Sequence, residues 1–194
     1  MYGLGKGRMG PWSIAAMAMI ASAGMAAPAG HAASAPVEAA SAGSHGFDFE
    51  YGRWRVHHRV KRADGTWQAF EGTSETRPML DGQGDIEENV FFRPTGNTHG
   101  VALRAFDPAT GLWAIWWIDG RNPHGPLDPP SKGRFENGVG RFYSDYVVNG
   151  QAMKTRLMWS QITARSARWE QASSSDGGRS WDTNWVMTFT REEP

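Results

Sequence analysis

The chain has 194 residues, of which 40% are hydrophobic and 12% aromatic, enough apolar material for one domain with a substantial core. Its 20 basic residues (Lys and Arg) balance its 20 acidic residues (Asp and Glu), which argues against a general affinity for nucleic acid or for acidic membranes. The absence of cysteine excludes disulfides, thiolate zinc sites and a catalytic thiol.

The N-terminal segment has the three parts of a secretory signal peptide. Lys6 and Arg8 precede an uncharged run, rich in Ala and Met, from residue 9 to residue 30, and small-residue cleavage patterns follow near residues 29–35. The apolar core of this run is short for a transmembrane span, which favours cleavage over a membrane anchor. We therefore predict a signal peptide at residues 1–35, a disordered leader at 36–46, and export to the periplasm or the medium.

The folded domain is predicted at residues 47–192. Its clearest strand signal is Arg53–Lys61, where Trp54, Val56, His58 and Val60 alternate with basic side chains or His57. The alternation predicts a strand that turns its apolar face and His58 inward.

Further segments with strand character are separated by turn signals such as Asp64-Gly65, Asn137-Gly138 and Asn149-Gly150. They are residues 67–76, 86–93, 101–106, 112–119, 134–136, 139–148, 153–160, 167–172 and 181–191. This pattern predicts an all-β fold, an antiparallel up-and-down meander barrel of about nine or ten strands. We expect the first and last strands to pair, because long tryptophan-rich edges left open would invite aggregation.

Several short motifs are spread from residue 47 to residue 191: Phe47-Asp48-Phe49, Gly52-Arg53-Trp54-Arg55-Val56, Phe106-Asp107-Pro108, Arg168-Trp169-Glu170-Gln171 and Asp176-Gly177-Gly178…Trp181…Asn184-Trp185. In these motifs the chain resembles an uncharacterised family of bacterial calycin-like (lipocalin-like) proteins. The resemblance implies a barrel that encloses a cavity for a small apolar molecule. It implies no catalytic residues.

The Gly-x-Trp start at Gly52 is also similar to that of haem-binding nitrobindin barrels, but Arg53 and Arg55 stand where those proteins favour glycine. We therefore predict no haem and no other cofactor. His57 and His58 point to opposite faces of a strand and could not bind one metal ion together, so no metal site is predicted.

Two titratable residues are candidates for chemistry inside the barrel. Alternation along residues 86–93 favours an inward Glu88, which could pair with His58 for proton transfer. Two other interpretations stay open: His58 is a buried structural group, or the register is shifted by one residue and Glu88 faces outward.

The favoured function is an exported protein that binds a small apolar or aromatic molecule in a Trp-lined cavity, with no nucleic-acid partner and no stable membrane insertion after signal cleavage. The predicted ligand-binding residues are Trp54, Val56, His58, Glu88, Trp116, Trp159, Trp169, Gln171 and Trp185. One alternative is a cofactor-free enzyme, an isomerase, cyclase or hydrolase that uses His58 with Glu88. Another is a filled barrel that serves as a structural or interaction module.

Overall fold

The computed structural model describes residues 43–193. The predicted signal peptide and most of the predicted leader lie outside the described residues. The described part of the chain begins with a short 3-10 helix, η1 (Gly43–His45), four residues before the domain start that we predicted from the sequence. No helix in the described part of the chain is long and apolar enough to cross a membrane.

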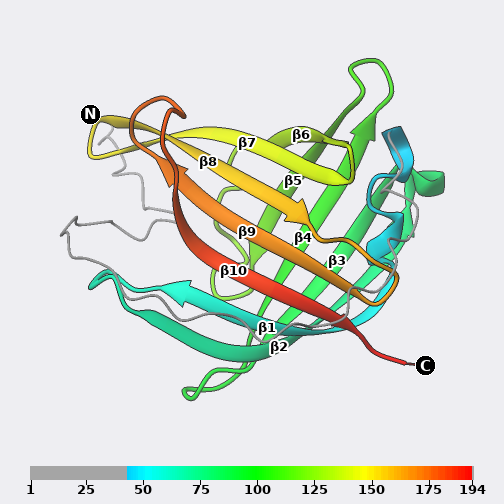
Figure 1. Cartoon of the computed structure of the whole chain (residues 1–194), viewed down its shortest axis with the longest axis horizontal. Coiled ribbons are helices and arrows are strands. Elements are labelled where there is room, and N and C mark those ends of the chain that lie inside the picture. Colours follow the sequence, from blue (N-terminus) through cyan, green and yellow to red (C-terminus); the bar gives the residue numbers. More distant parts are fainter. Residues whose placement is uncertain (1–42, 194) are drawn as a thin grey trace, which may run out of the picture.

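The strands form a closed antiparallel barrel in which each strand pairs with its neighbours in sequence (Figure 1). They are β1 (Gly52–Lys61), β2 (Trp67–Met79), β3 (Gly84–Phe91), β4 (Thr98–Asp107), β5 (Leu112–Asp119), β6 (Ser131–Glu136), β7 (Val139–Val148), β8 (Gln151–Ser160), β9 (Ser166–Ser174) and β10 (Asp182–Arg191). β10 pairs with β1, from Trp54 opposite Arg191 to Val60 opposite Trp185. The predicted all-β, up-and-down barrel and its closure by the first and last strands are confirmed.

The inner face of β1 is the predicted one, because Trp54, Val56 and His58 are buried and His57 is exposed. In β3 the predicted face is wrong by one residue. Glu87 is buried, whereas Glu88 is exposed and pairs with Arg77 at 3.4 Å on the outside of the barrel.

The prediction that Trp116 points into the barrel is also wrong. Trp117, its neighbour in β5, lines the barrel interior, and adjacent side chains of a strand point to opposite faces. Trp116 lies opposite Leu103 of β4 on the outer face, where it is half-buried. A run of large apolar residues covers both faces of this strand, so hydrophobicity alone does not distinguish them.

One end of the barrel is plugged by the chain that precedes β1. A second 3-10 helix, η2 (Asp48–Glu50), follows η1, and the two lie across this end (Figure 1). Phe47, which stands between them in the sequence, is fully buried in the core. The ring centroid of Phe47 lies 5.0 Å from that of Trp113, 4.9 Å from that of Phe135 and 5.5 Å from that of Phe142. We call this the closed end.

The C-terminal strand holds the plug in place through one side chain. Arg191 donates hydrogen bonds to the carbonyl oxygens of Phe49 at 2.5 Å and Tyr51 at 2.6 Å. Its guanidinium carbon also lies 4.1 Å from the ring centroid of Trp54. Charge-assisted hydrogen bonds of this kind are stronger than neutral ones. They bind the last strand, β10, to the segment that precedes β1.

The opposite, open end has a gap in its pairing. Only Trp113–Ile115 of β5 pair with β6, and residues 120–130, which include Pro123, Pro126, Pro129 and Pro130, connect the two strands. Proline cannot donate to a ladder, so this segment cannot continue the sheet. Side chains that point inward beyond Ile115 therefore face a space that β6 does not cover.

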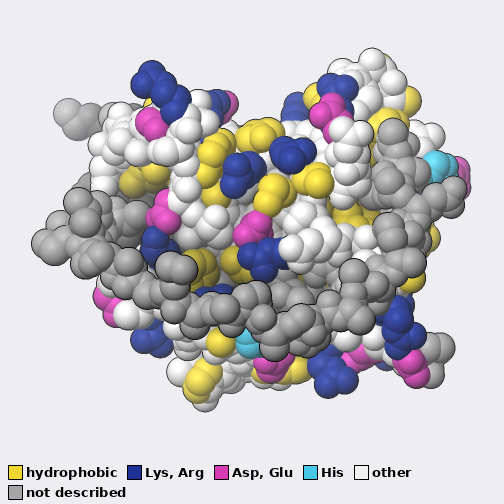
Figure 2. All heavy atoms as spheres, viewed as in Figure 1, with side chains coloured by type: hydrophobic (Ala, Val, Ile, Leu, Met, Phe, Trp, Pro, Cys, Tyr) yellow, Lys and Arg dark blue, Asp and Glu magenta, His cyan; other side chains and the backbone are white. Residues whose placement is uncertain are grey.

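The chain has equal numbers of basic and acidic residues. On the face shown in Figure 2, basic, acidic and hydrophobic side chains are interspersed. Several opposite charges pair across neighbouring strands, such as Arg53 with Glu75 at 3.0 Å and Lys154 with Asp145 at 2.6 Å. These exposed pairs each contribute little to stability.

Gly72 of β2 is required by close packing. A methyl group on its α-carbon would lie 2.5 Å from the carbonyl oxygen of Val90 and 2.8 Å from Nε2 of His58. We predict that Gly72→Ala lowers the free energy of unfolding by about 1–3 kcal/mol, as overpacking does in other cores. Urea unfolding measures this loss. Glu75→Gln, on the exposed face of the same strand, serves as control and should change it by less than ~0.5 kcal/mol. Equal effects of the two substitutions would contradict the packing argument.

Candidate functional site

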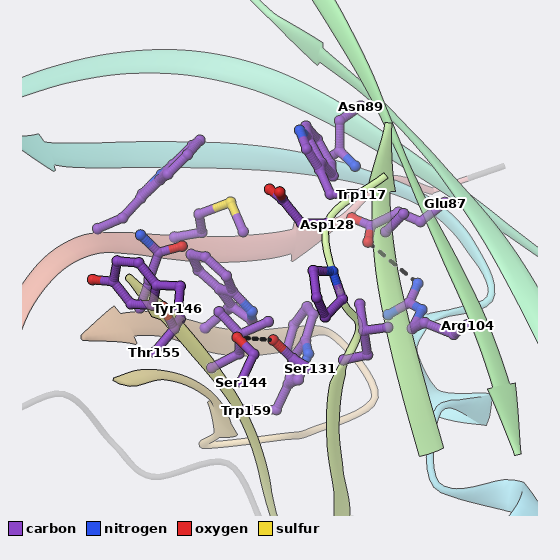
Figure 3. Close-up of a pocket in the computed structure, with 18 of the residues that line it drawn as sticks. Glu87, Asn89, Arg104, Trp117, Asp128, Ser131, Ser144, Tyr146, Thr155 and Trp159 are labelled. Atoms are coloured by element: carbon purple, nitrogen blue, oxygen red, sulfur yellow. Dashed lines mark hydrogen bonds and ion pairs between the residues drawn. The ribbon is translucent and has the colours of Figure 1, made fainter. Parts of the chain in front are cut away.

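The open half of the barrel contains a cavity of about 370 Å³, which we call the tryptophan cavity (Figure 3). Four tryptophans from four strands form much of its wall: Trp117 of β5, Trp159 of β8, Trp169 of β9 and Trp185 of β10. Ring pairs fix these walls, since Trp169 and Trp185 meet edge to face with centroids 5.9 Å apart. A cavity with rigid aromatic walls and a few polar groups is the usual form of a small-molecule site.

Gln171 of β9 is a polar group of this wall whose amide is held by its neighbours. Its Nε2 donates to Oδ1 of Asn184 at 2.9 Å, and Nδ2 of Asn184 donates in turn to Oγ of Ser173 at 2.8 Å. The chain of donors fixes the amide of Gln171, whose buried Oε1 accepts no hydrogen bond from any described residue. A buried acceptor of this kind favours a partner that brings an N–H or O–H group.

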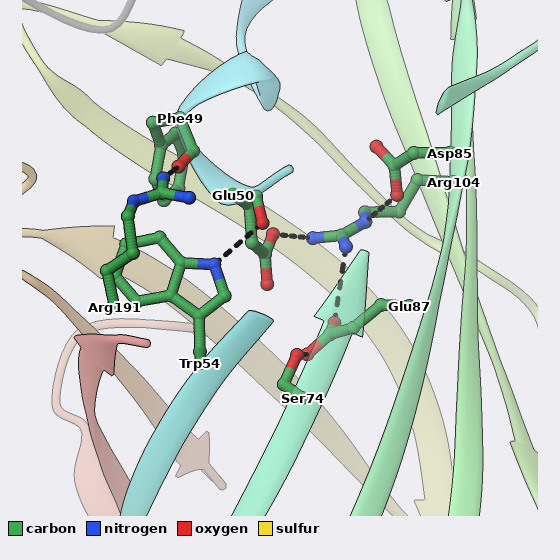
Figure 4. A network of polar contacts seen from close by, with 8 residues as sticks. All are labelled: Phe49, Glu50, Trp54, Ser74, Asp85, Glu87, Arg104 and Arg191. Atoms are coloured by element: carbon green, nitrogen blue, oxygen red, sulfur yellow. Dashed lines mark hydrogen bonds and ion pairs between the residues drawn. The ribbon is translucent and has the colours of Figure 1, made fainter. Parts of the chain in front are cut away.

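Towards the closed end, the cavity meets a buried ionic cluster centred on Arg104 of β4 (Figure 4). The Arg104 guanidinium contacts Glu50 of η2, donates to Asp85 of β3 at 2.5 Å, and lies 3.2 Å from Glu87 of the same strand. Ser74 of β2 donates to the other oxygen of Glu87 at 2.8 Å. Arg104 and Glu87 form part of the cavity floor, and Asn89 of β3 lies beside them in the lining.

Burial and the opposite charges of this cluster shift the pKa values of Glu50, Asp85 and Arg104. Burial raises the pKa of Glu50 well above its usual range, although Arg104 opposes the shift, and burial also raises the pKa of Asp85. For Arg104 burial works to lower the pKa, but the three carboxylates outweigh it and raise the pKa further. The guanidinium therefore stays charged, and burial favours the protonated forms of Glu50 and Asp85.

His58 lies behind the wall of the cavity. Its ring stacks on Phe70 with centroids 4.6 Å apart and meets Phe91 edge on at 5.2 Å. Its Nδ1 accepts a hydrogen bond of 3.3 Å from Nε1 of Trp185, a donor-only group, so the imidazole is held neutral on that side. Burial, followed by the positive charge of Arg93 and the proximity of His57, lowers the pKa of His58 from 6.5 to about 3.

The predicted ligand-binding residues thus occupy three different places. Trp159, Trp169, Gln171 and Trp185 come together in the cavity lining. Trp54 and Val56 belong to the packed core instead, and His58 supports Trp185 from behind. Glu88 and Trp116 lie on the outer face, so the predicted His58–Glu88 pair does not exist.

Sequence reasoning missed several residues of the lining, including Glu87, Asn89, Arg104 and Trp117. A polar strand face is a poor signal for an interior position, and Arg104 lies in a run of small and apolar neighbours that gave it no distinguishing mark. No group of three or more His, Asp or Glu side chains among residues 43–193 could hold a metal ion.

No family model matches the chain, and no curated protein matches it. The resemblance to an uncharacterised bacterial family therefore stays a prediction, while the closed up-and-down barrel that it implied is present. The fold is similar to a redesigned β-barrel, with a TM-score of 0.44 and 11% identity over 80% of this chain and 100% of that chain. It is also similar to the S-type phycobiliprotein lyase CPES from Guillardia theta, with a TM-score of 0.41 and 11% identity over 76% of this chain and 91% of that chain. Both likenesses are too distant to bear on ligand or activity.

The depressed pKa of His58 predicts a pH dependence of stability. The unfolded chain binds a proton at His58 below pH 6.5, whereas the folded protein does so only near pH 3, so stability is lost as pH falls through this window. The slope attributable to His58 reaches about 1.4 kcal/mol per pH unit. Urea unfolding of wild type and His58→Gln between pH 7 and pH 4 measures the difference. Parallel profiles for the two proteins would refute the buried, neutral imidazole.

The same residue gives a test of its structural role. We expect His58→Ala to lower the free energy of unfolding by on the order of 1–3 kcal/mol, because Trp185 loses its acceptor and a void opens beside Phe70. His57→Ala, which removes only an exposed contact of 2.6 Å with Glu71, is the control and should cost less than ~0.5 kcal/mol. A larger loss at His57 than at His58 would contradict this assignment.

The buried cluster predicts a large effect at Arg104. Arg104→Met leaves three carboxyl groups buried without their cation, and we expect a loss on the order of 3–5 kcal/mol in the free energy of unfolding. The loss should be greater at pH 8 than at pH 5, because carboxyls with raised folded pKa values are stable when protonated and destabilise the fold as pH rises. Thermal unfolding at the two pH values measures both effects. Arg77→Met, which removes an exposed pair with Glu88, is the matched control.

Proposed function

We propose that this protein binds a small apolar or aromatic molecule in the tryptophan cavity. The observation that carries the proposal is the combination of four tryptophan walls with the oriented amide of Gln171, whose Oε1 has no donor among the described residues. Apolar walls supply most of the binding free energy, and a few polar groups fix the orientation of the ligand. A ligand with one N–H or O–H group on an aromatic body matches this arrangement.

The position of the cavity supports binding over the two alternatives. An enzyme that uses His58 with Glu88 is disfavoured, because Glu88 lies outside and the imidazole of His58 packs between Phe70 and Phe91. A filled barrel is disfavoured by a space of about 370 Å³ next to the uncovered half of β5. The basic start and apolar run before residue 30 support the further proposal that the protein is exported.

Filling the cavity tests the proposal. N-phenylnaphthylamine is a neutral aromatic probe with one N–H group, and its fluorescence should rise on saturable binding to the wild-type protein. Thr155 of β8 lines the cavity, so Thr155→Phe should occupy the space and weaken probe binding by tenfold or more. A titration of both proteins measures the dissociation constants.

The control for this experiment is a substitution of the same kind on the outside of β8. Met158 alternates with the inward Leu157 and Trp159, so Met158→Phe adds an aromatic ring to the outer face. It should leave probe affinity within twofold of wild type. Absence of saturable binding to the wild type, or equal losses in both variants, would contradict binding in the cavity.

A further inference from the structure

A second pocket of about 410 Å³ lies at the open end, and we call it the mouth pocket. It shares Phe91, Trp117, Gln171 and Trp185 with the tryptophan cavity, so the two spaces have a common wall. The rest of its lining comes from strand ends: Val60, Lys61, Arg62, Ala63, Gln68, Arg93, Thr98, His99, Asp119, Arg121 and Asn184. A molecule bound in the tryptophan cavity could therefore extend into the mouth pocket.

The mouth pocket carries an excess of positive charge. Four of its lining residues are Lys or Arg, and Asp119 is the single carboxylate among them. Arg121 forms an ion pair with that carboxylate, with contacts of 3.0 Å and 2.8 Å. Lys61 forms an ion pair of 2.7 Å with Asp182, which lies outside the lining. Arg62 interacts with the nearby carboxylate of Asp64, so Arg93 is the cation of this lining that has no carboxylate partner among the described residues.

Arg93 differs from every other cation of the mouth. It makes no ion pair with the described residues, and its Nε is buried without an acceptor among them. Its guanidinium carbon lies 4.1 Å from the ring centroid of Phe70 and 5.8 Å from that of Phe91. Burial lowers the pKa of Arg93, and the neighbouring cation of Arg121 lowers it further, while no anion among residues 43–193 offsets its charge.

The position of Arg93 on these rings leaves a defined site for an anion. The donors of a guanidinium lie in its plane, so an aromatic ring that covers one face leaves the N–H groups at the edge available. The planar fork of donors matches the two oxygens of a carboxylate. Phe91, which contacts the guanidinium, also lines the tryptophan cavity, so a bound anion would lie next to the aromatic walls.

We propose that the ligand is an amphipathic monocarboxylate, whose apolar body occupies the tryptophan cavity and whose carboxylate is bound by Arg93 in the mouth pocket. This inference rests on the proposed binding function and names its ligand class. It assigns Arg93 as the residue that distinguishes a carboxylate from a neutral molecule with the same apolar body.

Decanoate and decanol form a suitable pair of probes, because they share an alkyl chain and differ in the charged head. Their dissociation constants are measured by calorimetry on the full-length protein. Arg93→Gln should weaken decanoate binding by about tenfold or more, which corresponds to about 1.4 kcal/mol, and should change decanol binding by less than threefold. Arg93→Lys keeps the charge but not the fork, so it should lie between wild type and Arg93→Gln.

Arg62→Gln is the matched control. Arg62 lines the same pocket and carries the same charge, but it is exposed and its Nε donates to Gln68 at 3.2 Å. Removing it changes the general electrostatic field of the mouth without removing the proposed contact, so decanoate affinity should fall by less than threefold. An equal loss in Arg62→Gln and Arg93→Gln would overturn the assignment of Arg93.

Two further results separate this inference from the proposed function. If decanol and N-phenylnaphthylamine bind but Arg93→Gln weakens the binding of decanoate and decanol equally, the assignment of the carboxylate site is wrong. The proposed binding function then stands. If none of the three probes binds the wild-type protein, the binding function is wrong and the ligand class falls with it. Melting temperatures of all variants ensure that the comparison is made between folded proteins.

Discussion

The fold depends on one buried cation. Arg104 joins Glu50 of the plug to Asp85 and Glu87 of β3, and its guanidinium carbon also lies 4.3 Å from the ring centroid of Phe47. A buried charge is tolerated only where opposite charges and hydrogen bonds surround it, so each carboxyl must come to a fixed place around Arg104. The chain before β1 is thereby held across the closed end, and the cluster becomes the floor of the cavity.

This constraint explains which parts of the fold could be predicted. β1 was predictable because its buried face is apolar apart from His58 and its exposed face is basic or histidine, so the alternation is unambiguous. In β3 the outward residues include Ile86 and Val90, while the buried face carries Asp85, Glu87 and Asn89. The rule that apolar residues point inward therefore selects the wrong face, and only the partner on β4 reveals the right one.

The candidate site was predictable to a similar extent. Trp159, Trp169 and Trp185 were predicted to face inward and they line the cavity, and Gln171 follows Trp169 at the spacing of one strand face. β5 gave no such guidance, because large apolar residues occupy both of its faces and the interior position could be Trp116 or Trp117. Arg93 follows Phe91 and Phe92 at the end of β3, where alternation no longer constrains a side chain. Its importance lies in tertiary contacts with Phe70 of another strand.

The two ends of the barrel interior are lined by groups of different charge. At the floor, three carboxyl groups, those of Glu50, Asp85 and Glu87, surround the single cation of Arg104. At the mouth, cations outnumber carboxylates in the lining. In an interior of low dielectric constant, such a gradient acts strongly on a charged ligand. An anionic head group would be repelled from the floor and attracted to the mouth, so an amphipathic anion would enter with its apolar end first, leaving Arg93 to meet its charge.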